Sequence, residues 1–197
     1  LEIYDNDNLV SLTGLTSITT IEAALEERGL YITSNDALTS LGGLNGLNSL
    51  SANLSIIFND NLISLSGLDN LITIKKDVEI KSNYSLVSLQ GLDNLTSIWG
   101  NLTIGNVITG TGQIFPGNIS LTSLDGLNNL TSIGYEDIED NADDGGQLII
   151  TGCDSLTSLD GLGNLHTLHQ KYPNDTYNVL HIGSNSTAPN SDYFYNA

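Results

Sequence analysis

One spacing of apolar residues repeats along most of this chain and constrains its fold more than any other feature. Six segments match [LV]-x-[ILV]-x-x-[NC]-x-x-L-x-S-L-x-G-L-x-x-[LI]-x-x-[LI], the fifth with one interruption, and they begin at Leu1, Leu30, Leu54, Val78, Leu102 and Leu148. A seventh segment begins at Leu180 and fades. Such a unit cannot bury its own apolar face and must stack on its neighbours. We therefore expect a mainly β solenoid of about six to seven coils.

The regular units are 24 residues long, as measured from Leu30 to Leu54 and onward to Leu102. Each opens with apolar and polar residues in alternation, which is typical of a half-buried strand. Stacked copies of this segment predict a parallel sheet with strands about 4.8 Å apart. Little helix is expected. The exception is the segment 21–29, which has a helical pattern that ends on a C-cap glycine, Gly29.

An asparagine recurs three residues after the second apolar position of each strand. Facing inward, it would bond backbone groups of adjacent coils that are otherwise buried without partners. Asn118 and Asn185 fall in the same row, and Cys153 takes this place in the sixth copy. A structural role for Cys153 is favoured over that of a reactive nucleophile, since no activating base accompanies it. The expected structural ladder comprises Asn6, Asn35, Asn59, Asn83 and Cys153.

Two further rows are the same in all six copies. The serines Ser11, Ser40, Ser64, Ser88, Ser123 and Ser158 are expected to form a second inward ladder, although plain alternation would place them on the opposite face from the leucines. The glycines Gly14, Gly43, Gly67, Gly91, Gly126 and Gly161 predict a corner that needs positive φ or a close approach of neighbouring coils.

The repeat covers residues 1–184, with insertions at 22–29, 105–117, 134–147 and 169–179. Residues 185–197 abandon it and form a C-terminal tail or cap. The chain begins in register with a repeat and contains no methionine, so we expect its true start to lie upstream.

The 197-residue chain holds 23 acidic and 5 basic residues, a net charge of −18. This charge argues against nucleic acid and anionic membrane surfaces as partners, because both would repel it. It suits a soluble extracellular or cell-surface protein, or one that binds cations. The single cysteine permits no internal disulfide, and no apolar run reaches the ~18–20 residues that span a bilayer.

The segment Leu95–Ile104, LTSIWGNLTI, followed by Asn106, resembles the repeat of receptor L domains. It is still more similar to related repeats of fungal cell-wall surface proteins and of secreted bacterial and protist leucine-rich-repeat proteins. The resemblance covers residues 1 to about 184. It implies a right-handed β-solenoid of the leucine-rich-repeat class, with roles in extracellular recognition or in wall and matrix structure. The chain lacks the disulfides of receptor L domains, so growth-factor binding does not carry over.

N-glycosylation sequons suggest that N-linked glycans are attached to the chain. Some of these triplets arise by chance in a repeat rich in Asn, Ser and Thr, and Asn83, Asn118 and Asn185 fall in the inward row. The more accessible candidates are Asn94, Asn129 and Asn174, followed by Asn53 and Asn101.

An acidic loop, residues 134–147, provides hard oxygen ligands of the kind that Ca²⁺ prefers. The candidate ligands are Asp137, Asp140, Asp143 and Asp144. Their order does not match an EF-hand loop, and a solvated acidic loop is the plainer interpretation. With the insertion 105–117, this loop flanks the fifth coil. The alternative function is therefore a soluble ligand-binding module for calcium or carbohydrate.

Outward residues of the predicted sheet could form a contact stripe for a protein or a glycan at the cell surface: Tyr4, Tyr31 and Ile57. The aromatic residues of the tail, Tyr193, Phe194 and Tyr195, are further interface candidates, as a cap or against a neighbouring subunit. The residue directly before each serine of the recurring serine row is β-branched in all six copies. Such a row is most simply interpreted as ordinary sheet surface, and the alternatives are an assembly face or an ice-binding plane.

No catalytic signature appears in the sequence. His166, His169 and His181 show no metal-ligand spacing, and there is no phosphate loop or nucleophile elbow. We expect a non-enzymatic extracellular protein for surface recognition, adhesion or matrix structure, with no cofactor. A variant of this function is that the chain is the subunit of a glycosylated fibre. Head-to-tail contacts between open solenoid ends do not close into a ring and therefore give a filament.

Overall fold

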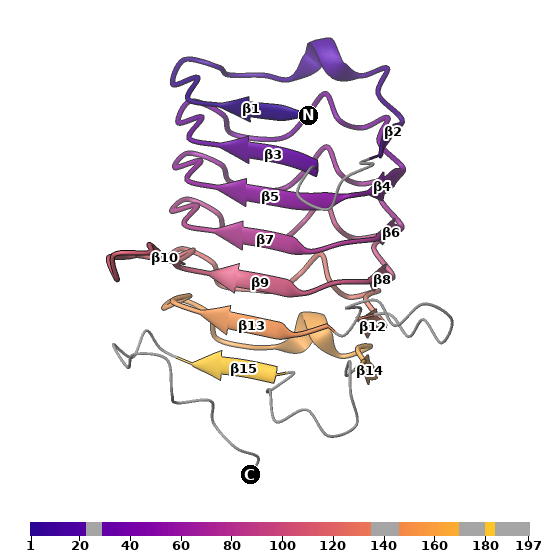
Figure 1. The fold of residues 1–197 in the computed structure, drawn as a ribbon, viewed down its shortest axis with the longest axis vertical. Helices are drawn as coiled ribbons and strands as arrows, with labels where there is room; N and C mark the ends of the chain where they lie inside the picture. Colours follow the sequence, from indigo (N-terminus) through magenta and orange to yellow (C-terminus); the bar gives the residue numbers. More distant parts are fainter. Residues whose placement is uncertain (23–28, 135–145, 170–179, 184–197) are drawn as a thin grey trace.

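The computed structural model describes residues 1–22, 29–134, 146–169 and 180–183, most of which belong to two parallel sheets and their connecting turns (Figure 1). The first sheet has seven strands in chain order: β1 (Glu2–Tyr4), β3 (Gly29–Thr33), β5 (Asn53–Ile57), β7 (Val78–Lys81), β9 (Leu102–Gly105), β13 (Leu148–Thr151) and β15 (Leu180–Gly183). Equivalent positions of the repeat face each other, as Leu54 faces Val78. This confirms the parallel sheet that the alternating segments predict.

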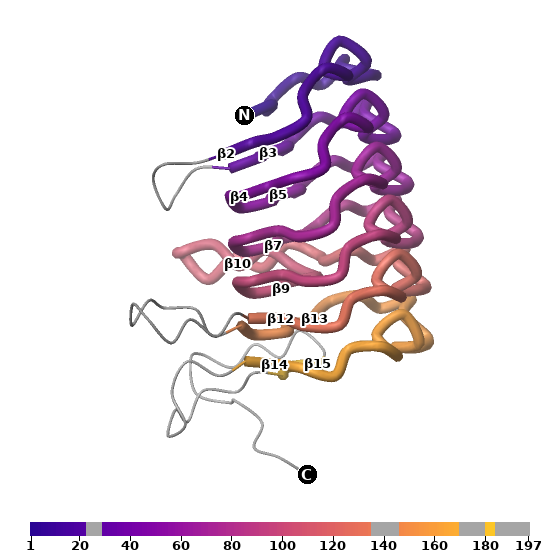
Figure 2. Tube along the Cα trace, turned by 90° about the vertical axis from the view of Figure 1, so that its right-hand side faces the viewer, coloured from indigo at the N-terminus to yellow at the C-terminus, as the bar shows by residue number. Residues whose placement is uncertain are grey.

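The second sheet has six strands of two or three residues that the repeat pattern did not predict. In chain order they are β2 (Thr20–Glu22), β4 (Ser49–Ser51), β6 (Thr73–Ile74), β8 (Ser97–Ile98), β12 (Ser132–Ile133) and β14 (Thr167–Leu168). The chain alternates between the two sheets. Figure 2 shows their strands together on one side and the turns of the repeat on the other. The result is a mainly β, repeat-like architecture, compatible with the expected solenoid.

The apolar positions of the repeat form the core inside the stacked copies. In the third copy, all seven of them are 0% exposed: Leu54, Ile56, Leu62, Leu65, Leu68, Leu71 and Ile74. Burial of each such side chain contributes about 1.5–3 kcal/mol. Because equivalent positions stack from copy to copy, the buried residues form one core cluster from Leu12 to Ile150.

The other regular elements of the described residues are short. Two 3-10 turns, η1 (Thr13–Leu15) and η2 (Asp160–Leu162), occupy the glycine corner of the first and sixth copies. In the insertion 105–117, β10 (Val107–Ile108) pairs antiparallel with β11 (Ile114–Phe115).

The helix expected over residues 21–29 is wrong at both of its ends. Ile21 lies in β2 opposite Leu50, and Gly29 lies in β3 opposite Asn53, while residues 23–28 are outside the described residues. A Cβ atom on Gly29 would lie 2.1 Å from the Asn53 carbonyl oxygen. This glycine therefore permits close pairing of two strands, and sheet pairing prevails over the local helical pattern.

The glycine row behaves as its regularity predicts in most copies. Gly43, Gly67, Gly91 and Gly126 have φ between 110° and 122°. A Cβ atom on Gly91 would lie 2.1 Å from the carbonyl oxygen of Leu65 in the preceding copy. Gly14, in the first copy, has no atom within 4 Å of such a Cβ. The glycine is thus required wherever another copy stacks against the corner.

The inward serine ladder is wrong. All six serines are half-buried or exposed. In the second to fifth copies, the leucines two residues before and one residue after the serine take the inward positions instead. The serine hydroxyls bond locally: Ser123 Oγ accepts the backbone N–H of Asp125 at 2.9 Å, and Ser158 Oγ accepts that of Asp160 at 3.0 Å. Such short-range bonds stabilise a turn rather than a contact between copies.

The asparagine row forms the ladder that its spacing predicts. Asn59 accepts the backbone N–H of Asn35 on its Oδ1 at 3.2 Å, and its own backbone N–H donates to Asn83 Oδ1 at 3.1 Å. Its Nδ2 donates to the carbonyl oxygens of Ile32 and Ile57, at 2.9 and 3.1 Å. Asn83 repeats the arrangement with Asn118. Each buried asparagine thus satisfies backbone groups of its own copy and its neighbours.

Candidate functional site

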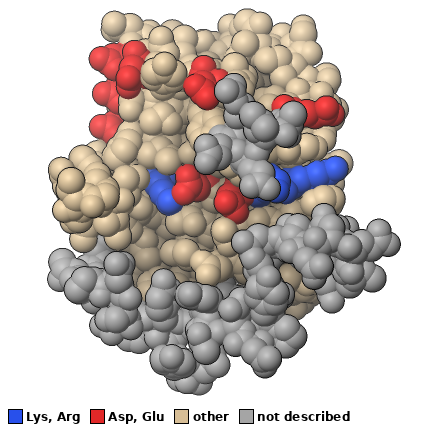
Figure 3. Space-filling model, viewed as in Figure 1, with Lys and Arg blue, Asp and Glu red and all other residues tan. Residues whose placement is uncertain are grey.

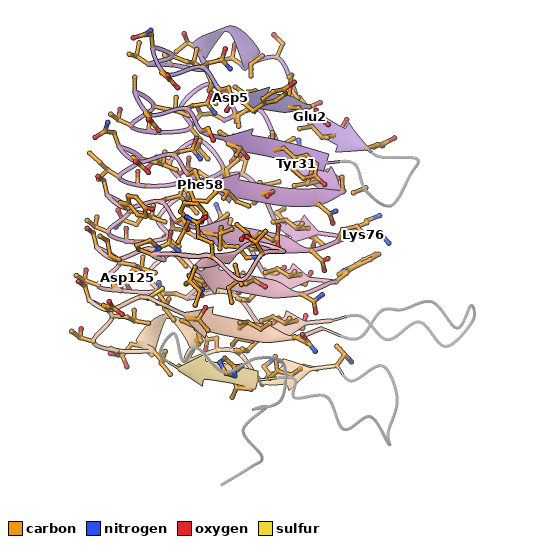
Figure 4. The ribbon with its side chains drawn as sticks, turned by 60° about the vertical axis from the view of Figure 1, so that its left-hand side comes forward. Glu2, Asp5, Tyr31, Phe58, Lys76 and Asp125 are labelled. Carbon is orange, nitrogen blue, oxygen red and sulfur yellow. The ribbon has the colours of Figure 1, made fainter. Side chains whose placement is uncertain are left out.

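The outward face of the first sheet brings the predicted contact stripe together. Tyr4 faces Thr33, which faces Ile57, so that Tyr4 and Ile57 stand in one row across three strands. Tyr31 lies in the adjoining row, between Glu2 and Ser55 (Figure 4). Tyr4 is 58% exposed, whereas Tyr31 and Ile57 are half-buried. The stripe is one surface fixed by the register of the two ladders that join β1, β3 and β5.

Polar contacts continue this face beyond the stripe. Lys81 forms an ion pair with Glu79, and the hydroxyl of Ser55 donates to Glu79 Oε2 at 3.5 Å. Asn53 Nδ2 donates to the hydroxyl of Tyr31 at 3.4 Å. Figure 3 shows lysines across the middle of this face beside acidic side chains. The face therefore joins an aromatic and aliphatic part to a part with paired charges.

The hairpin of β10 and β11 is attached to the ends of two strands of the first sheet. The ring of Phe115 contacts Phe58 edge to face, with centroids 5.1 Å apart, and Ser82 Oγ donates to the Pro116 carbonyl oxygen at 2.7 Å. Phe58 and Ser82 both have positive φ, 56° and 53°. Ile108 on the hairpin is 64% exposed. The insertion thus presents an apolar side chain beside the first sheet.

An acidic row lies in the turn after the first-sheet strands, at Asp7, Asp36 and Asp60. Burial, and then the charge of Asp36, raise the pKa of Asp60 above its ordinary value. Burial and the charge of Asp60 likewise raise the pKa of Tyr84. Like charges therefore stack along this edge.

Cys153 follows Asn118 in the row of the buried asparagine ladder. Burial raises the pKa of its thiol to about 11, although hydrogen bonds from Asn118 oppose the shift and Asp154 adds to it. Its Sγ donates to the Thr151 carbonyl oxygen at 3.6 Å. A thiol held in its neutral form is a poor nucleophile.

The glycosylation candidates differ in exposure. Asn94 and Asn129 are exposed, Asn53 and Asn101 are half-buried, and Asn174 lies outside the described residues. Asn83 and Asn118 are 0% exposed within the buried ladder.

Two more polar ladders were missed by the sequence analysis. In a turn ladder, each side-chain Nδ2 donates to a carbonyl oxygen of the preceding copy at 2.6–2.7 Å; its members are Asn70, Asn94, Asn129 and Asn164. In a strand-start ladder, Asp77 N–H donates to Asn53 Oδ1, and Asn101 N–H donates to Asp77 Oδ1. The asparagine that recurs two residues after the Gly-Leu pair was the available signal for the turn ladder.

Several predicted residues lie outside the described residues: Asp137, Asp140, Asp143 and Asp144 of the acidic loop, Asn185, and Tyr193, Phe194 and Tyr195 of the tail. Among the described residues, no group of three or more His, Cys, Asp or Glu side chains is placed to hold a metal ion. His166 Nδ1 lies 2.9 Å from Thr167 Oγ1 at an exposed position.

No family model, curated protein or solved structure matches this chain. In the described part of the chain, no helix is long and apolar enough to cross a membrane. The class that the repeat and the two sheets define is a mainly β repeat protein with parallel sheets.

Proposed function

We propose that the chain is a right-handed, leucine-rich-repeat-type β-solenoid that serves extracellular surface recognition, adhesion or matrix structure without catalysing a reaction. Its 24-residue period and parallel sheets support the solenoid class. The acidic composition supports an extracellular or cell-surface location, because it favours solubility and disfavours nucleic acid.

The observation that carries the recognition function is the contact stripe of Tyr4, Tyr31 and Ile57 on the outward face of the first sheet. Neighbouring strands are about 4.8 Å apart, so these side chains form a fixed array rather than a mobile loop. Tyrosine offers an apolar ring and a polar hydroxyl, which suits a protein or a glycan. The partner is therefore an extended molecule that lies across several strands.

Binding to glycan arrays and to insoluble cell-wall polysaccharides tests this function. The triple substitution Tyr4→Ala, Tyr31→Ala and Ile57→Ala is expected to weaken binding at least tenfold. Ile63→Ala is the matched control, because Ile63 is a 50% exposed apolar residue outside both sheets. Equal loss in both variants, or binding unchanged in the triple variant, would remove the stripe from recognition.

A ligand-binding module around the fifth coil is the second candidate. It is favoured by the hairpin of β10 and β11, which Phe58 and Ser82 fix beside the first sheet. The acidic loop would supply calcium ligands. Isothermal titration with CaCl₂ is expected to give binding that disappears when Asp140, Asp143 and Asp144 are changed to Asn. Titrations without heat in the unaltered chain would rule out the calcium form.

Fibre formation is a variant of the first function. The strands β1 and β15 are the two edges of one parallel sheet, and Leu180 and Ile182 in β15 are 48% and 44% exposed. A second copy that continues the sheet would cover these side chains. Light scattering over a range of concentrations is expected to detect assemblies, whereas a monomer at high concentration would exclude the fibre.

A further inference from the structure

Two exposed asparagines in consecutive repeat copies occupy the same position and start the same triplet. Asn94 is followed by Leu95 and Thr96, and Asn129 by Leu130 and Thr131. Both lie in the turn before a second-sheet strand, β8 or β12, rather than on an outward sheet face. The backbone N–H of Thr131 donates to the carbonyl oxygen of Thr96 at 2.9 Å, which places the two turns in adjacent layers.

The hydrogen bonds of these asparagines are compatible with an attached sugar. Asn94 Nδ2 donates to the Asp69 carbonyl oxygen, and Asn129 Nδ2 to that of Asp93, both at 2.7 Å. An amide nitrogen carries two hydrogens, and N-glycosylation replaces one of them. The turn ladder can therefore be kept with the remaining hydrogen while the sugar extends into solvent.

Two other sequons are blocked by the fold. Asn83 is 0% exposed, and its Nδ2 donates to the carbonyl oxygens of Ile56 and Lys81 at 2.9 and 3.1 Å, so that both hydrogens are used. Asn118 is also 0% exposed, and its Nδ2 donates to the Ile80 carbonyl oxygen at 2.7 Å. A sugar at either residue would break the buried ladder and has no space.

The half-buried sequons are less suited than the exposed pair. Asn53 and Asn101 belong to the strand-start ladder, where each Oδ1 accepts a backbone N–H from the next copy. Asn53 Nδ2 also contacts the Tyr31 hydroxyl of the contact stripe. A glycan there would lie beside the proposed recognition face.

We infer that Asn94 and Asn129 are the N-glycan attachment sites of the described residues and that their glycans leave the outward face of the first sheet clear. The inference rests on the proposed extracellular location. In the reaction, Nδ2 attacks the anomeric carbon of a lipid-linked oligosaccharide diphosphate supplied by the secretory pathway. The nitrogen–carbon bond forms, the bond from that carbon to the diphosphate oxygen breaks, and Nδ2 loses one proton to a base. Figure 2 shows the turns of the repeat on the side away from the strands.

Site mapping on chain secreted from a eukaryotic host tests the assignment. Peptide N-glycosidase in ¹⁸O-water converts each glycosylated asparagine to labelled aspartate, which mass spectrometry locates. Label is expected at Asn94 and Asn129 and absent at Asn83 and Asn118. The variant Ile72→Thr creates a sequon at Asn70 in the same turn ladder and is expected to add a third glycan, because Asn70 makes the equivalent bond to the Asn45 carbonyl oxygen.

Matched variants separate glycosylation from folding. Asn70→Gln alters the same turn ladder without touching a sequon and is expected to leave both glycans in place, whereas Asn94→Gln with Asn129→Gln removes them. Folded secreted chain without label at Asn94 and Asn129, or with label at Asn53, Asn83, Asn101 or Asn118, overturns the assignment. Glycan-free chain that still binds through the contact stripe leaves the proposed function intact. Glycosylated chain that binds no surface contradicts only that function.

Discussion

Individual asparagines of the stacked rows differ in how much they stabilise the fold. Burial decides how much free energy is lost when a backbone N–H or carbonyl group loses its asparagine partner. Asn59 is 0% exposed and satisfies the Asn35 backbone N–H and the Ile32 carbonyl oxygen. Each buried group left unpaired costs about 1–3 kcal/mol. We expect Asn59→Ala to lower the free energy of unfolding by about 3 kcal/mol or more in urea titrations followed by circular dichroism.

Asn70→Ala is the control for that measurement. Asn70 is exposed and its side chain donates to the Asn45 carbonyl oxygen. Water replaces an exposed partner, so the expected loss is about 1 kcal/mol or less. Equal losses in the two variants would show that burial of the asparagine row contributes nothing special.

Cys153, in the row of the buried asparagine ladder, gives a prediction about reactivity. Its pKa rises from the ordinary 9.0 to about 11 in the folded chain. At pH 8 the thiolate fraction is then about a hundredfold smaller than in the unfolded chain, and the thiolate is the reacting form. Modification by a maleimide is expected to be about a hundredfold slower in buffer than in urea. Equal rates would mean that the thiol is accessible and ionised in the fold.

The same pKa fixes the sign of a pH effect. Because the folded value lies above the unfolded value, the contribution of Cys153 to stability is complete below pH 9 and is lost as the pH rises toward about 11. Cys153→Ser, which does not titrate in this range, is expected to lose less stability between pH 9 and 11 than the unaltered chain.

At the scale of the element, the turn that each copy makes depends on one glycine. Gly91 has φ of 112°, and a Cβ atom would lie 2.1 Å from the Leu65 carbonyl oxygen, so Gly91→Ala must displace two stacked turns. We expect a loss of more than about 3 kcal/mol of unfolding free energy. Gly14→Ala is the control and is expected to be neutral or stabilising by up to about 1 kcal/mol, since no atom lies within 4 Å of its Cβ. Similar melting temperatures for the two variants would contradict the stacking requirement.

The strands and the buried ladder were predictable because repetition multiplies a weak local signal. One alternating triplet says little, but the same triplet opposite the same asparagine in each copy indicates a sheet. The helical pattern over residues 21–29 occurs in one copy only, so comparison with other copies could not correct the helix prediction. In the structure, Ile21 and Gly29 at its two ends pair in β2 and β3. The short second-sheet strands, such as Thr73–Ile74, fall below the length at which alternation is readable.

Side-chain direction was the harder part of the candidate site. Ser64 and Ser88 are as regular in sequence as Asn59 and Asn83, yet they are half-buried. A row is kept uniform by a local turn as well as by contact between copies, and a sequence does not distinguish the two. The outward position of Tyr4, Tyr31 and Ile57 was predictable, because they alternate with the inward residues Ile3, Ile32 and Ile56.

For the whole molecule, the excess of negative charge repels itself and opposes the folded state. The chain has 23 acidic and 5 basic residues, and the one ion pair among the described residues joins Lys81 to Glu79. Salt screens repulsion, and the Debye length falls from about 30 Å at 0.01 M to about 10 Å at 0.1 M. The melting temperature at pH 7 is therefore expected to rise over this range of NaCl.

Part of this repulsion acts between the carboxylates of Asp36 and Asp60. The pKa of Asp60 lies above its unfolded value of 3.8, so its contribution is complete below that pH and is lost as the pH rises through the folded value. At pH 7 the charged pair therefore costs stability. Asp36→Asn is expected to raise the melting temperature and reduce its gain with salt, more than Asp125→Asn, which removes one exposed charge elsewhere (Figure 4). At pH 3 the advantage over Asp125→Asn should vanish, because Asp60, whose pKa is raised above 3.8, is then mostly protonated and no longer repels Asp36. An Asp36→Asn advantage that persists at pH 3 would assign the effect to packing rather than to charge.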